Sequence, residues 1–86
     1  MNVPDGIRVR IATPDAASAF LLERRLLPRH PSTLVHGDAW SVELCAHATE
    51  ELPEIEATVA RWLRESSVEA TTIDYDGGLR QVEVRA

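Results

Sequence analysis

The sequence predicts a single α+β domain in which two helices cover one face of a five-stranded antiparallel sheet. Three observations support this prediction. Segments that alternate apolar and polar residues, as half-buried strands do, occur near the start, in the middle and at the end of the chain. Two other segments carry apolar residues at helical spacing. Glycine turn signals separate two pairs of neighbouring strand-like segments, which indicates hairpins.

Composition limits the possible functions. The 86 residues suffice for one domain spanning 1–86, and 44% hydrophobic with 27% charged residues is typical of a soluble globular protein. No apolar run approaches the roughly 20 residues that cross a membrane. Fourteen acidic residues against nine basic ones give a net charge of −5, which disfavours nucleic acid as a partner. One cysteine and no secretory signal lead us to expect a cytoplasmic protein.

The first two elements follow from the segment between residues 7 and 27. Residues 7–11, "IRVRI", form a strand with its three aliphatic side chains inward and with Arg8 and Arg10 outward. A helix is predicted over 14–27, with Thr13 as N-cap, Pro14 at the first helical position and Asp15 in the first turn. Its apolar face comprises Ala16, Ala19, Phe20, Leu22, Leu26 and Leu27.

One leucine does not fit this helical face. Leu21 points away from the other apolar residues, so it is predicted to be a lone exposed side chain or a contact with a partner.

The next segment predicts a hairpin around the turn at Gly37 and Asp38. Its inner face pairs Val35 with Trp40, Thr33 with Val42 and Pro31 with Leu44, and its outer face carries His30, His36, Ser41, Glu43 and Cys45.

A second helix over residues 50–66 has the clearest amphipathic pattern, with a stripe of Leu52, Ile55, Val59, Trp62, Leu63 and Ser66. The final hairpin turns at Gly77 and Gly78. This turn predicts the pairs Ile73 with Val82, Thr71 with Val84 and Tyr75 with Arg80.

The element order βαββαββ, with right-handed crossovers, predicts the strand order 5, 4, 1, 3, 2. The first four strands resemble the ferredoxin-like βαββαβ plait, and the fifth is an extra C-terminal strand. The resemblance is architectural and covers nearly the whole chain. It is similar to small bacterial ferredoxin-like domains that have no assigned activity.

Reactive side chains on the open face do not form a known motif. Cys45, His47 and His30 match no strong zinc-ligand spacing. Neither a helix N-terminus nor a basic cluster is placed to activate Cys45 as a nucleophile. The loop "ATPDAAS" lacks the glycines of the acylphosphatase loop and the CxxC of metallochaperones. The open face also lacks the aromatic residues with which RNA-binding plaits stack bases. We therefore expect no catalytic residue, no metal and no cofactor.

One plait class remains as an alternative. ACT domains bind amino acids beside the first strand-to-helix loop, which commonly reads Asp, any, Pro, Gly. Pro14 is similar to that proline, whereas Asp15 replaces the glycine. This resemblance implies a small ligand near Thr13, Pro14 and Asp15, while the simpler interpretation is that Pro14 starts a helix.

The sequence thus predicts a non-enzymatic protein-interaction module. The outward cross-strand charges of Arg8, Arg10 and Glu43 are available to join two copies as a homodimer. The expected surface is the open face at Arg8, Arg10, Glu43 and Cys45, or the exposed Leu21. The alternatives are an acidic or amino-acid ligand near Thr13 and Asp15, and a catalytic or metal site at Cys45 and His47.

Overall fold

The computed structural model of the protein describes residues 6–76 and 78–84. Its elements are β1 (Ile7–Thr13), α1 (Ala16–Arg25), the short 3₁₀ helix η1 (Leu27–Arg29), β2 (Ser32–His36), β3 (Ala39–Ala46), α2 (Glu51–Ser66), β4 (Ala70–Tyr75) and β5 (Gly78–Glu83). The five strands form one antiparallel sheet in the order β2-β3-β1-β4-β5. This confirms the predicted α+β class and strand order.

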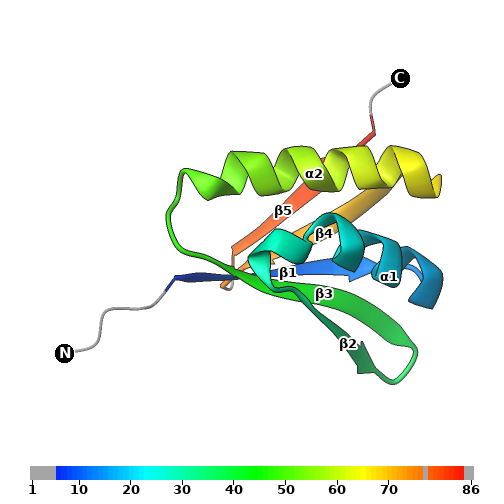
Figure 1. The fold of residues 1–86 in the computed structure, drawn as a ribbon. Coiled ribbons are helices and arrows are strands. Elements are labelled where there is room, and N and C mark those ends of the chain that lie inside the picture. The colour runs from blue at the N-terminus through cyan, green and yellow to red at the C-terminus, as the bar shows by residue number, and fades with distance from the viewer. Residues whose placement is uncertain (1–5, 77, 85–86) are drawn as a thin grey trace.

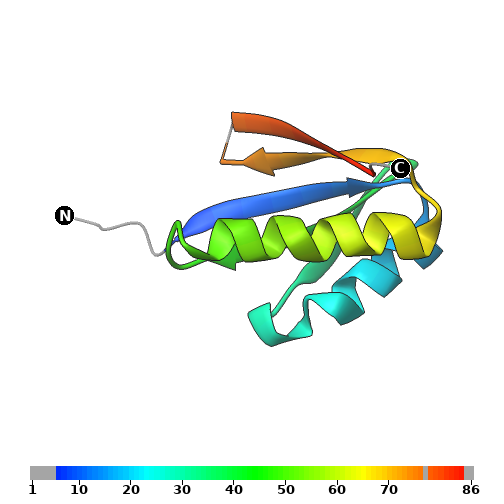
Figure 2. The ribbon, with the colours of Figure 1, turned by 90° about the horizontal axis from the view of Figure 1, so that it is seen from above.

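Both helices lie on the same face of the sheet, as Figures 1 and 2 show from two directions. In Figure 2, α1 lies toward the β2 side and α2 crosses the middle of the sheet. The opposite face of the sheet is covered by no element of the part of the chain that the structure describes. None of the described helices is long and apolar enough to span a membrane.

The core lies between the sheet and the two helices. Val9 and Ile11 of β1 are fully buried, as are the members of the predicted α2 stripe at positions 55, 59, 62 and 63. Trp62 is the largest of these side chains, and its indole N–H donates to the Ser18 carbonyl of α1 over 2.8 Å. A buried indole N–H needs an acceptor, so this bond fixes α2 against α1 as well as satisfying the tryptophan.

Helix α1 begins later than predicted. Asp15, not Thr13, is the N-cap, because its extended backbone lets the carboxylate accept the Ser18 backbone N–H over 2.8 Å. Thr13 is the last residue of β1 and pairs with Trp40 of β3. Pro14 therefore precedes the helix and lies between strand and cap, outside the first helical turn.

The buried face of α1 also differs from the prediction. Leu21 is half-buried and packs against the core, so its predicted exposure is wrong, whereas Phe20 and Leu27 are 51% and 56% exposed. Leu21 lies one helical turn before Arg25, which pairs with Glu65 of α2. The α1 flank that faces α2 is thus covered, whereas no described helix lies beside the flank at the sheet edge.

The first hairpin agrees with the prediction at Val35–Trp40 and Thr33–Val42. Gly37 at the turn has a φ of 63°, a conformation that glycine adopts without strain. Strand β2 begins at Ser32, so Pro31 precedes the strand and its predicted pairing with Leu44 lies just beyond the end of the β2–β3 ladder.

The second hairpin is shifted by two residues from the prediction. Tyr75 pairs with Gly78, which places Ile73 opposite Arg80 and Thr71 opposite Val82. The turn starts at Asp76, whose φ is 56°, and the predicted turn residue Gly77 lies outside the described residues. Because a two-residue shift preserves the alternation of faces, the predicted inward and outward sets are unchanged.

Candidate functional site: the open sheet face and the β2 edge

The open face of the sheet carries a row of paired charges across its central strands. Arg10 lies opposite Glu43, and Arg8 lies opposite Cys45, on the neighbouring strands β1 and β3. The Glu43 carboxylate lies 3.0 Å from the Arg10 guanidinium and 3.9 Å from that of Arg8. The predicted positions of these four residues and their cross-strand charge pairing are therefore confirmed.

A second acidic strand flanks these arginines. Asp74 of β4 lies opposite Arg10 on the side away from Glu43, and a shallow depression is lined by Arg8, Arg10, Asp74 and Asp76. The charges thus alternate from acid to base to acid across β3, β1 and β4. An anionic ligand at the arginines would also meet carboxylates, which weakens any electrostatic attraction to it.

Cys45 and His47 lie at the end of β3, on either side of the buried Ala46. Cys45 is exposed on β3, and the His47 backbone N–H donates to the Glu51 carboxylate over 3.0 Å. Within residues 6–76 and 78–84, no group of three His, Cys, Asp or Glu side chains is placed to hold a metal ion.

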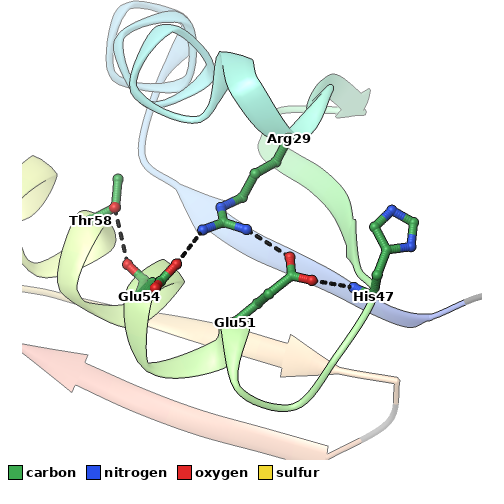
Figure 3. Close-up of polar contacts among 5 residues, drawn as sticks. All are labelled: Arg29, His47, Glu51, Glu54 and Thr58. Atoms are coloured by element: carbon green, nitrogen blue, oxygen red, sulfur yellow. Dashed lines mark hydrogen bonds and ion pairs between the residues drawn. The ribbon is translucent and has the colours of Figure 1, made fainter.

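The Glu51 carboxylate belongs to an ion-pair network that joins η1 to α2 (Figure 3). Arg29 reaches Glu51 over 2.7 Å and Glu54 over 2.8 Å, and the side chains of Arg29 and Glu51 are each only 26% exposed. The network ties the segment before β2 to the first turns of α2. Glu51 and Glu54 lie in the first turn of α2, and such acidic residues are a signal that can be seen in the sequence, but the partner Arg29 is distant in sequence and could not be identified.

The loop between β1 and α1 brings Thr13, Pro14 and Asp15 together, as their sequence adjacency requires. Hydrogen bonds from the backbone N–H and then from the side chain of Ser18 lower the pKa of Asp15. The Asp15 carboxylate thus occupies the α1 N-terminus, where an anionic ligand would otherwise bind. The Thr13 hydroxyl oxygen is buried and has no hydrogen-bond partner in the structure.

A polar contact between α2 and the last hairpin was not predicted. The Tyr75 hydroxyl donates to Glu56 over 2.6 Å, and Arg80 lies 3.2 Å from the same carboxylate group. Burial, followed by the hydrogen bond and charge of Glu56, raises the pKa of Tyr75. No sequence pattern links these residues, because they come together only when the hairpin packs beneath α2.

An apolar cluster lies at the β2 edge of the sheet. Phe20 of α1 and Val35 of β2 are each 51% exposed, and Trp40 of β3 lies beside both. The Phe20 and Trp40 rings meet edge to face with centroids 5.9 Å apart. We call these three residues the edge cluster.

The α1 flank continues along β2 from the edge cluster. The Thr33 hydroxyl donates to the Glu23 carboxylate, one turn after Phe20, and Leu27 follows at the end of this flank. Three of the four exposed large hydrophobic residues of the described chain, Phe20, Leu27 and Val35, therefore belong to α1, η1 and β2. Because Phe20 and Leu27 fit the predicted apolar face of the first helix, they were expected in the core, and the sequence did not indicate this surface.

No protein-family model, no curated protein and no solved structure matches this chain.

Proposed function

We propose that the protein is a small non-catalytic interaction module that works as a homodimer. The observation that carries the proposal is the exposure of Phe20 and Val35, which lie beside the half-buried Trp40, and of Leu27 in η1. Contiguous exposed apolar residues are characteristic of surfaces that bind another protein, because their burial in an interface removes them from water.

The polar groups of the open face favour binding over chemistry. Glu43 is shared by two arginines, and Asp74 lies across from Arg10 on the neighbouring strand. Opposite charges paired in this way across neighbouring strands stabilise the sheet by about 0.2–1 kcal/mol each, which is a structural role.

Sedimentation velocity of the full chain over a wide dilution series tests this proposal. We expect a monomer–dimer equilibrium, with the sedimentation coefficient rising as the concentration increases. A species of monomer mass at every concentration, up to several hundred micromolar, would refute it.

A second candidate function is the binding of an amino acid at the β1–α1 loop. It is favoured by one observation, the buried hydroxyl oxygen of Thr13 that has no partner. A ligand present at 100 times its dissociation constant would stabilise the protein by about 2.7 kcal/mol, which a thermal-shift screen of the amino acids detects. The shift should disappear in Thr13→Val. No shift with any amino acid in the native chain removes this candidate.

A further inference from the structure

We propose that the second copy of the chain joins along β2, by antiparallel pairing of the two β2 strands across a twofold axis at Leu34. The two five-stranded sheets would then form one continuous sheet. This inference rests on the proposed homodimer and identifies the surface through which it forms.

The two edges of the sheet differ in how well they are protected from pairing. Strand β2 reads "STLVH" and contains no acidic residue, no lysine or arginine and no proline. The opposite edge strand, β5, reads "GLRQVE" and carries Arg80 and Glu83. Because charged residues and prolines are the usual means of blocking strand addition, β2 is the edge left open to another strand.

The hairpin turn determines which backbone groups of β2 face outward. Gly37 and Asp38 form a two-residue loop flanked by the pair His36 and Ala39, and such flanking residues exchange backbone hydrogen bonds. Hydrogen-bonded pairs alternate along an antiparallel ladder, so Leu34 also bonds to β3. The N–H and C=O groups of Thr33 and Val35 therefore point away from β3.

These outward groups select one register. With the twofold axis at Leu34, Thr33 lies opposite Val35 of the second copy, and the two symmetric pairs form four backbone hydrogen bonds. An axis at Thr33 would place Val35 opposite Pro31, which has no N–H to donate. An axis at Val35 would place Thr33 opposite the turn residue Gly37.

The side chains agree with this register. On the helix face, Val35 and its neighbours Phe20 and Trp40 would pack against the segment around Thr33 of the second copy. On the open face, the two half-buried Leu34 side chains would meet at the axis. The pairing thus covers the edge cluster, and it buries no residue of the charged row on β1 and β3.

A pair of matched lysine variants tests the surface. Val35→Lys places a charge on the proposed interface, whereas Leu79→Lys places one on β5, where Leu79 is 72% exposed. We expect Val35→Lys to raise the dimer dissociation constant by at least about tenfold and Leu79→Lys to leave it unchanged. Circular dichroism melts of both variants establish that they are folded.

Engineered cysteines in a Cys45→Ser background test the register. Leu34→Cys should form an intermolecular disulfide rapidly under mild oxidation, because facing residues of a non-hydrogen-bonded pair lie within disulfide distance. Ser32→Cys shares the face and strand, but it would lie opposite His36 and should cross-link slowly. Equal dimerisation of Val35→Lys and the native chain, or faster cross-linking at Ser32 than at Leu34, would overturn the inference while the proposed homodimer stands. A native chain that stays monomeric would refute both.

Discussion

Alanine substitutions at Gly6 and Gly37 allow the effect of steric overlap on stability to be separated from that of backbone strain. Gly6 has a φ of 141°, and a Cβ at that position would lie 2.4 Å from the Ala46 carbonyl oxygen. Gly37 has a φ of 63°, and nothing lies within 4 Å of its Cβ position. Gly6→Ala therefore introduces strain and a backbone overlap, whereas Gly37→Ala introduces strain alone.

The expected magnitudes follow from these contacts. A left-handed backbone costs an alanine about 1–2 kcal/mol, and the restricted unfolded chain offsets about 0.4–1 kcal/mol of this, so Gly37→Ala should lose about 1 kcal/mol. At Gly6 the strain is about 1–3 kcal/mol. The overlap adds to it, because either the β3 backbone at Ala46 shifts or the pairing of Ile7 with Ala46 is lost. We expect a total loss of about 3 kcal/mol.

Urea denaturation of the two variants and the native chain, followed by circular dichroism, measures these losses. All three samples are measured at the same protein concentration, because the stability of an associating protein depends on that concentration. If Gly6→Ala unfolds at the same urea concentration as Gly37→Ala, or at a higher one, the close approach of Gly6 to β3 does not constrain the fold and the reasoning is wrong.

Three further predictions concern side-chain contacts. Trp62→Phe removes the hydrogen bond to Ser18 and leaves part of a buried volume empty, so it should lower the free energy of unfolding by about 2 kcal/mol in chemical denaturation. The folded state raises the pKa of Tyr75 above its ordinary value of 10.0, so the native chain should lose stability as the pH rises above 10. In pH-dependent melts, Tyr75→Phe should lose less stability over the same range than the native chain. The pKa of the Asp15 carboxyl is lower in the folded state than its ordinary value of 3.8. The ionised carboxylate therefore stabilises the fold at pH values above 3.8, and this contribution is lost as the pH falls. Asp15→Asn, which can still cap α1, should therefore show a smaller loss of melting temperature on acidification than the native chain, and an equal loss would contradict this assignment.

The sheet could be predicted because its signals are local. The alternation in β1 and the glycine turn at Gly37 fix which side chains share a face, and so they placed Arg8, Arg10 and Glu43 correctly. The predicted pairing of the last hairpin is shifted by two residues because Asp76-Gly77 and Gly77-Gly78 are both turn signals. Aspartate also tolerates a positive φ in turns, so the sequence alone did not show which of the two dipeptides forms the turn.

The candidate site could be predicted only in part, because burial at a sheet edge depends on the arrangement of the helices. Phe20 and Leu27 fit an apolar helical face, yet α1 sits over the edge of the sheet and leaves them exposed. Leu21 does not fit that face, yet it packs on the flank toward α2. The contacts of Arg29 with Glu51 and of Tyr75 with Glu56 join distant segments, and no spacing in the sequence encodes them.

The central place of β1 in the sheet affects the order in which the chain can fold. Each hairpin, β2 with β3 and β4 with β5, can close from neighbouring residues, but the two hairpins meet only through β1. During synthesis the β1 segment emerges before the other four strands, yet it lacks its β4 neighbour until residues near Tyr75 have emerged. Pairing of β1 with β4 is therefore a late, long-range event, whereas its pairing with β3 can form as soon as Ala46 is available.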